Sequence, residues 1–218
     1  MEDELVELLM SEPVGCALWP EQTEGPYHRD APLEREDIRE DRPGVPLRLG
    51  LRLVAAEDGT PLAGVPVEVW QADHEGRYSG FRPFRARPGQ VVTSDSVPRD
   101  IVAADETFLR GVQRTDADGM CAFRTVYPGW YSSRAVHIHV QAHLGERTAT
   151  TQLYFAETIT DDVFAVPPYA GRPRRDTTTE TDSIFIEEDG KDAVLRVEGS
   201  VTQGYTGVLC FAVAADPR

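Results

Sequence analysis

The clearest hydrophobic pattern in the chain is a regular alternation of apolar and polar residues. Every second residue from Leu47 to Leu53 is leucine, while Arg48 and Arg52 fall between them. Successive side chains of an extended chain point to opposite faces, so a period of two residues is typical of a half-buried β-strand. This segment is therefore predicted to form a strand whose leucine face lies in the core.

Further short apolar segments follow, and turn-forming pairs such as Asp58-Gly59 separate nearly all of them. No long helical period lies between them. Short strands at this spacing, without crossover helices, predict an all-β fold: an antiparallel β-sandwich with Greek-key connections. The segments predicted as strands are residues 65–70, 120–126, 134–142, 148–155, 183–187, 193–197 and 207–214.

The beginning of the chain lacks this alternation. Within residues 2–10, one side of a short helix that could dock on the body of the protein or on a partner carries Leu5, Val6, Leu8 and Leu9. The stretch that follows is rich in Pro, Glu, Asp and Arg, which predicts an extended arm over the surface. A chain of 218 residues suits a single all-β domain. We therefore expect a short helix and arm over residues 1–45 and a β-sandwich domain over residues 46–218.

Two long stretches, residues 81–109 and 161–182, interrupt the strand pattern. Long connections in a compact domain are commonly functional loops, and on a sandwich they gather at one end, where they could wall a pocket. Arg82, Arg85 and Arg87 in the first stretch could meet an anionic ligand, although loop arginines are usually solvated.

Charge and composition remove several classes of function. The formal net charge is −15, whereas a protein that binds phosphate backbones needs a basic face, so nucleic acid is not expected as a partner. No apolar run reaches the roughly 18 residues that a membrane helix requires. The N-terminus is acidic where a secretion signal would be basic, which predicts a cytoplasmic protein.

The three cysteines, Cys16, Cys121 and Cys210, are odd in number and lack C-x-x-C spacing. This pattern indicates neither a zinc ribbon nor a disulfide framework. The sequence therefore predicts buried, reduced thiols.

Candidate chemistry begins at His137 and His139. Residues two apart on a strand face the same side, so both imidazoles could reach one metal ion. Histidines that only hydrogen-bond within the fold are an equally reasonable interpretation of this motif by itself.

Several familiar metal sites fit the surrounding residues poorly. The H-x-D spacing of ferrous facial-triad oxygenases is absent, because His139 stands where the acid would be. Tyr131 and Glu146 break the spacing of a cupin site. His143 lies too far along the strand to complete a structural zinc site with His139.

A tyrosine oxygen is the remaining candidate donor. The segment Tyr127-Pro-Gly-Trp-Tyr131 comes just before the histidine strand, and its turn can bring a tyrosine over the histidine face. A bound metal ion can hold a phenol as phenolate, and Fe(III) is well matched by anionic oxygen donors.

Seven motifs are spread over most of the chain: Gln22-Thr-Glu-Gly-Pro-Tyr27, Gly64-Val-Pro-Val-Glu-Val-Trp-Gln-Ala-Asp73, Gly76-Arg-Tyr-Ser-Gly80, Arg114-Thr-Asp-Ala-Asp-Gly119, Tyr127-Pro-Gly-Trp-Tyr131, Arg134 with His137-Ile-His139, and Thr151-Gln-Leu-Tyr-Phe155. In content and order they resemble the intradiol ring-cleavage dioxygenases, the family that contains catechol and protocatechuate dioxygenases. That family takes one tyrosine from G-x-Y, one from P-G-x-Y and both histidines of H-x-H. The resemblance thus implies one Fe(III) per chain, held by Tyr78, Tyr131, His137 and His139.

The same resemblance implies a reaction. Dioxygen would open a catechol-type ring between its two hydroxyl-bearing carbons, giving a cis,cis-muconate-type diacid. Tyr131 would leave the iron and accept a substrate proton, Arg134 would be a cation beside the substrate, and Gln152 would lie near the reacting carbon. The implied partners are a small catechol and O₂, with assembly as a homo-oligomer, most simply a dimer.

Alternatives to this interpretation remain. Residues 59–69 also resemble the first hairpin of transthyretin-like domains, which would make the chain a non-catalytic binding module. An enzyme of the same fold acting on an unusual catecholic secondary metabolite is a further possibility. Among the other tyrosines, Tyr27, Tyr127, Tyr154 and Tyr169 are expected to be packing residues.

Overall fold

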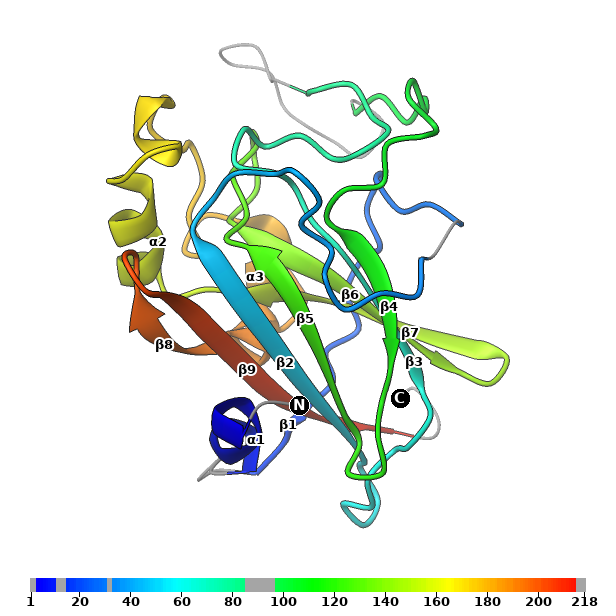
Figure 1. Ribbon diagram of the computed structural model, residues 1–218. Coiled ribbons are helices and arrows are strands. Elements are labelled where there is room, and N and C mark those ends of the chain that lie inside the picture. Colours follow the sequence, from blue (N-terminus) through cyan, green and yellow to red (C-terminus); the bar gives the residue numbers. More distant parts are fainter. Residues whose placement is uncertain (1–2, 11–14, 31–32, 85–96, 215–218) are drawn as a thin grey trace.

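The computed structural model describes residues 3–10, 15–30, 33–84 and 97–214 (Figure 1). Within these residues the chain is mostly β, as predicted, and its strands form two sheets. Helices and irregular connections lie around the sheets in Figure 1.

The first sheet has five strands. At its centre β2 (Pro46–Ala55) lies between β5 (Met120–Val126) and β9 (Gly204–Val213). Two short strands, β1 (Ala17–Leu18) and β8 (Arg196–Ser200), also pair with β9.

The second sheet has four strands, all paired antiparallel. Their order is β4 (Arg110–Arg114), β3 (Pro66–Trp70), β6 (His137–Leu144) and β7 (Arg147–Tyr154). β4 was not anticipated from the sequence.

The prediction of a purely antiparallel sandwich is wrong in the first sheet. There β9 runs parallel to β2 over the register Leu47 to Ala55, and parallel to β1 as well. The alternation of apolar and polar residues indicates which face of a strand is buried. It does not indicate whether the neighbouring strand runs parallel or antiparallel. The Greek-key order of connections stays a prediction.

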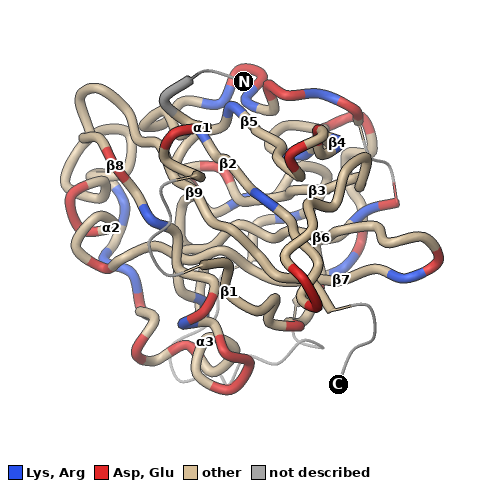
Figure 2. The backbone as a smooth tube through the Cα atoms, turned by 90° about the horizontal axis from the view of Figure 1, so that it is seen from below, with Lys and Arg blue, Asp and Glu red and all other residues tan. Residues whose placement is uncertain are grey.

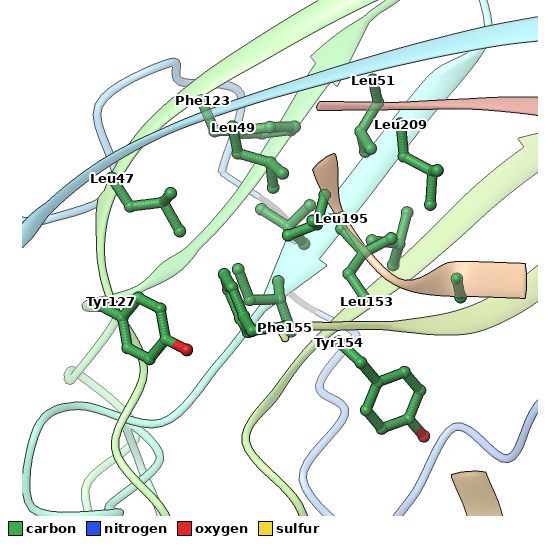
Figure 3. Close-up of a cluster of buried hydrophobic side chains, with 14 of the residues drawn as sticks. Leu47, Leu49, Leu51, Phe123, Tyr127, Leu153, Tyr154, Phe155, Leu195 and Leu209 are labelled. Carbon is green, nitrogen blue, oxygen red and sulfur yellow. The ribbon is translucent and has the colours of Figure 1, made fainter. Parts of the chain in front are cut away.

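The leucine face of β2 lies in the main core, as expected. Leu47 is 2% exposed and Leu49 0%. Figure 3 shows this stripe facing side chains that include Leu153 of β7. Because alternate residues of β6, such as Ile138, also belong to this core, its histidines point to the opposite face of the second sheet. Each leucine buried in this way contributes roughly 1.5–3 kcal/mol to stability.

The beginning of the chain is more deeply integrated than an arm lying over the surface. The expected helix forms as α1 (Asp3–Met10), and its leucines pack on Met120 and Val208. Further along, Trp19 and Ile38 join the main core. The domain boundary at residue 45 stays a prediction.

The prediction of three reduced thiols is wrong for two of them. Cys16 and Cys210 form a disulfide, which ties the arm to β9 across a sequence separation of 194 residues. Cys121 is free and buried, as expected. Cysteine count and spacing missed this bond because its partners meet only through the pairing of β1 with β9.

The segment after β7 contains helices where strands were predicted. Residues 183–187 form α3 (Ser183–Glu187), because the preceding Asp182 side chain accepts hydrogen bonds from the amides of Ile184 and Phe185, as an N-cap does. A short apolar run by itself cannot distinguish a strand from a helix. The strand expected over 193–197 begins at Arg196, after the 3₁₀ helix η3 (Gly190–Ala193).

The second long stretch expected as a loop is partly helical. It contains the second half of α2 (Glu157–Phe164) and the 3₁₀ helix η2 (Tyr169–Gly171). In the first stretch, Arg82 is exposed, whereas Arg85 and Arg87 lie outside the described residues.

Charged positions are spread over the molecule rather than segregated, with acidic and basic positions interspersed in Figure 2. Among the described residues, no helix combines the length and the apolar character that crossing a membrane would require.

Candidate metal centre

The two histidines of the H-x-H motif lie side by side at the start of β6. Their Nε2 atoms are 3.1 Å apart, and both side chains are buried on the face of the sheet that points away from the main core. Strand alternation alone produces this arrangement, as the sequence predicted.

Two tyrosines reach the same point from different connections. Tyr78 comes from the turn after β3 and Tyr131 from the connection between β5 and β6. Their Oη atoms lie 3.4 Å and 3.2 Å from Nε2 of His137. Donor atoms about 2 Å from a first-row metal ion lie roughly 3 Å from one another, so the distances of the other three donors from Nε2 of His137 are compatible with one ion.

Glycines allow the two tyrosine connections to meet. A Cβ on Gly129 would lie 2.4 Å from the carbonyl oxygen of Asp73, and one on Gly76 would lie 2.1 Å from the carbonyl oxygen of Trp130. Gly76 also has a φ of +80°, a conformation that other residues rarely adopt. The G-x-Y and P-G-x-Y spacings thus reflect a close backbone contact that brings Tyr78 and Tyr131 together.

The surroundings of both imidazoles favour their neutral form. The Nδ1 atom of His137 lies 2.7 Å from the carbonyl oxygen of Ala135, which assigns the proton to Nδ1 and leaves the lone pair on Nε2, as metal binding requires. Burial lowers the pKa of His137 and of His139, and the Arg134 guanidinium lowers both further. His139 also stacks on Trp70, with ring centroids 4.8 Å apart, and its Nδ1 is buried without a hydrogen-bond partner.

The two phenols require a cation to ionise. Burial raises the pKa of Tyr78 well above 10 and also raises that of Tyr131, although Arg134 opposes both rises. A bound trivalent ion is the kind of charge that reverses this preference and holds phenols as phenolates. Among the described residues, no group of three or more His, Cys, Asp and Glu could hold a metal ion. Any metal centre built from His137 and His139 therefore depends on the phenols.

Arg134 and Gln152, both expected near the substrate, contact each other. The Arg134 Nη2 atom donates to Oε1 of Gln152 at 2.5 Å, and Nε donates to Oδ2 of Asp182 at 2.9 Å. Gln152 Nε2 donates to the carbonyl oxygen of Thr23 at 3.0 Å. Both ends of the Gln152 amide are therefore engaged within the protein, and the place of Gln152 near the reacting carbon stays a prediction.

Several residues of this site were not anticipated as functional. Tyr27 stacks on Tyr78 with ring centroids 4.4 Å apart, and Gly25 lies against His139. Gln22 accepts a hydrogen bond from the backbone of Gln152, and Asp182 pairs with Arg134. The motif at residues 22–27 contains Gln22, Gly25 and Tyr27 and could have pointed to them. No sequence motif pointed to Asp182.

The remaining candidates have other partners, as expected. The hydroxyl of Tyr127 lies 2.7 Å from that of Thr160, and Tyr169 donates to the carbonyl oxygen of Tyr127. The Nε2 atom of His143 lies 3.5 Å from Glu68. The packing interpretation of these tyrosines is supported, and His143 does not join the four donors.

A pH effect is expected at His28, whose imidazole lies 3.6 Å from Glu24 and 3.4 Å from Glu68. Burial lowers the pKa of His28, but the hydrogen bond and charge of Glu68, together with Glu24 and Asp30, outweigh burial and raise it above 6.5. The charged imidazole therefore stabilises the fold fully below pH 6.5, and this contribution is lost as the pH rises through the raised pKa.

We expect the free energy of unfolding to decline less between about pH 6 and pH 8 in His28→Asn than in the wild type, as measured by urea denaturation. Glu68→Gln should reduce the decline in the same way. Identical pH profiles for wild type and both variants would contradict this account.

Comparison with known proteins agrees with the geometry. A family model described as dioxygenase matches residues 20–182. A solved intradiol ring-cleavage dioxygenase from Tetranychus urticae is 32% identical, covers 93% of this chain and 97% of its own, and superposes with a TM-score of 0.79.

Bacterial relatives match over shorter parts. The chlorocatechol 1,2-dioxygenase of Cupriavidus pinatubonensis is 32% identical in an alignment of 162 positions that covers 64% of this chain and 56% of that protein. The protocatechuate 3,4-dioxygenase beta chain of Burkholderia cepacia is 30% identical in an alignment of 198 positions that covers 78% of this chain and 74% of that one. This chain spans about half the length of the first curated relatives that it matches. These similarities leave a non-catalytic binding module without support, and the chain belongs to the intradiol ring-cleavage dioxygenase family.

Proposed function

We propose that this protein uses O₂ and one ferric ion to cleave a catechol-type ring between its two hydroxyl-bearing carbons, giving a cis,cis-muconate-type diacid. The ion would be held by Tyr78, Tyr131, His137 and His139. One observation carries the proposal: two phenol oxygens and a second imidazole nitrogen lie 3.1–3.4 Å from Nε2 of His137. Two phenolates and two neutral imidazoles suit Fe(III), which prefers anionic oxygen donors.

A bound Fe(III) would supply a positive charge that holds the catechol through both oxygens and makes its ring reactive toward O₂. The residues of the chain prepare this chemistry. Tyr78 and both histidines are fully buried, so substrate binding would not expose them to bulk water. Tyr27 over Tyr78 and Gly25 against His139 close the site from the side of the arm.

Tyr131 is the proposed proton acceptor. Its Oη atom is buried next to His137, and burial raises its pKa. A phenolate oxygen in such surroundings holds a proton firmly, so Tyr131 can take one of the two catechol protons at Oη.

Arg134 is the proposed cation beside the substrate. Its guanidinium is permanently charged and is fixed by Asp182 and Gln152. Negative charge that develops on the opening ring would be stabilised by this group, because a positioned charge in a buried site needs no reorganisation during the reaction. Gln152 would assist by orienting Arg134.

The substrate is proposed only as a class. The relatives are named for chlorocatechol, catechol and protocatechuate, which share the two adjacent ring hydroxyls that a chelating metal centre requires.

A homodimer stays a prediction. The same holds for a cytoplasmic location, and the Cys16–Cys210 disulfide is a feature of oxidising compartments that weighs against it.

The proposal is tested by loading the purified protein with ferric iron, recording its visible spectrum, and measuring O₂ uptake with catechol, protocatechuate and hydroxyquinol. We expect a tyrosinate-to-iron absorption band, one ion per chain, and a diacid product from at least one of the three. A protein that stays colourless after ferric reconstitution would refute the metal centre.

A further inference from the structure

We propose that Asp182 is a positioning residue for this reaction: its carboxylate fixes both the Arg134 guanidinium and the backbone that orients His137. The inference rests on the proposed function and extends it to a residue that also caps a short helix. It is carried by four hydrogen bonds to one fully buried carboxylate.

The two carboxylate oxygens of Asp182 accept hydrogen bonds from different parts of the chain. Oδ1 accepts from the amides of Ile184 and Phe185, at 2.9 Å and 3.2 Å, and so caps α3. Oδ2 accepts from Nε of Arg134 at 2.9 Å and from the amide of Ala135 at 2.7 Å. Capping uses only one oxygen, and the other is directed at the start of the histidine strand.

The contact with Arg134 determines where the guanidinium lies. Asp182 holds its Nε edge, while Nη2 donates to Gln152 at 2.5 Å and lies 3.4 Å from the Tyr154 hydroxyl. Contacts at Nε and Nη2 together fix the plane of a guanidinium group. Without Asp182 one of these two anchors is lost, and the charge can move away from the position where it would stabilise the reacting ring.

The contact with Ala135 reaches the histidine. Asp182 holds the amide of Ala135, and the carbonyl oxygen of the same residue lies 2.7 Å from Nδ1 of His137. Groups that orient a metal-binding histidine typically change metal affinity or activity by about 10- to 100-fold when they are lost. Asp182 therefore supports the proposed centre through a second, independent path.

Asp182→Asn and Asp182→Ser separate this role from helix capping. Both replacement side chains are good N-caps, so α3 can form, but neither supplies an anionic oxygen to Arg134 and Ala135. The matched control is Asp161→Asn, which removes the carboxylate from an exposed pair with Arg175. Circular dichroism and thermal unfolding establish that each variant folds.

We expect kcat to fall about 10- to 100-fold in both Asp182 variants with KM nearly unchanged, because the Arg134 charge acts mainly on the transition state. In an Arg134→Gln background, Asp182→Asn should cause little further loss of kcat per bound iron, since the residue acts on turnover through Arg134. This double variant leaves no unpaired buried charge, so it also serves if Asp182→Asn alone folds poorly.

Iron release provides a readout that does not depend on turnover. Release of ferric iron to a chelator, followed by loss of the visible band, should be about tenfold faster in Asp182→Asn than in Asp161→Asn. It should also be faster in the double variant than in Arg134→Gln alone, because the path through Ala135 does not involve Arg134.

The outcomes separate the two proposals. A wild-type protein that binds no ferric iron refutes the proposed function and this inference with it. A coloured, active wild type whose Asp182 variants match Asp161→Asn in kcat and in iron release overturns the inference alone. Fully additive losses in kcat for Asp182→Asn and Arg134→Gln would show that Asp182 does not act through Arg134.

Discussion

Replacing Tyr78 by phenylalanine is expected to lower ferric iron affinity by more than about 100-fold, beyond the upper end of what loss of an outer hydrogen-bond partner costs. The substitution removes one of the two proposed anionic donors and leaves the buried ring in place, so the fold should persist. His139→Ala should have the same effect, because it removes one of the two proposed nitrogen donors. Metal analysis after gel filtration and the visible spectrum measure the result.

The matched control is Tyr127→Phe. Tyr127 is as deeply buried as Tyr78, but its hydroxyl lies 2.7 Å from that of Thr160 and not beside the histidines. This variant should keep its iron and its colour. Unchanged iron content in Tyr78→Phe, or iron loss in Tyr127→Phe, would mean that the ligand assignment is wrong.

Removal of the Cys16–Cys210 disulfide is expected to lower the free energy of unfolding by about 2–5 kcal/mol. The bond closes a loop with a sequence separation of 194 residues. A disulfide that closes a long loop removes more conformational freedom from the unfolded chain than one that closes a short loop. We therefore expect a loss toward the upper end of this range. Urea denaturation of Cys16→Ser, compared with the oxidised wild type, measures the difference.

Reducing agent supplies an internal control for this experiment. Reduced wild type should unfold like Cys16→Ser, and Cys16→Ser should not respond to reductant. The free Cys121 is the matched site, and Cys121→Ala should keep the full difference between oxidised and reduced protein. A wild type whose unfolding is insensitive to reductant would show that this bond contributes nothing to stability.

Strands could be predicted from the sequence where the alternation of apolar and polar residues indicates which side chains are buried. The leucine alternation predicted β2 and its buried face. The H-x-H spacing predicted that both imidazoles lie on the same face of their strand. Residues 183–187 were assigned incorrectly because a short apolar run fits a strand or a helix equally well, and the cap at Asp182 decides between them. The parallel pairing of β9 with β2 has no local signature at all.

The residues of the site also fall into those that the sequence identified and those that only the structure revealed. Two histidines and a nearby tyrosine followed from spacing, whereas Tyr78 was identified only through the family resemblance of its G-x-Y motif. The structure brings Tyr78 within 3.4 Å of His137 because Gly76 and Gly129 allow their connections to touch. Asp182 could not have been found from the sequence, since it lies 48 residues from Arg134 in a segment without a recognisable motif.

The sequence by itself determined the features that depend on neighbouring residues: strand faces, the shared side of His137 and His139, and the family motifs. Only the tertiary structure decided which distant segments meet, including Cys16 with Cys210, the arm with Gln152, and Asp182 with Arg134. Periodicity is a property of the local backbone, so it can be read along the chain. Contacts between distant residues depend on how the whole chain packs, which no local pattern encodes.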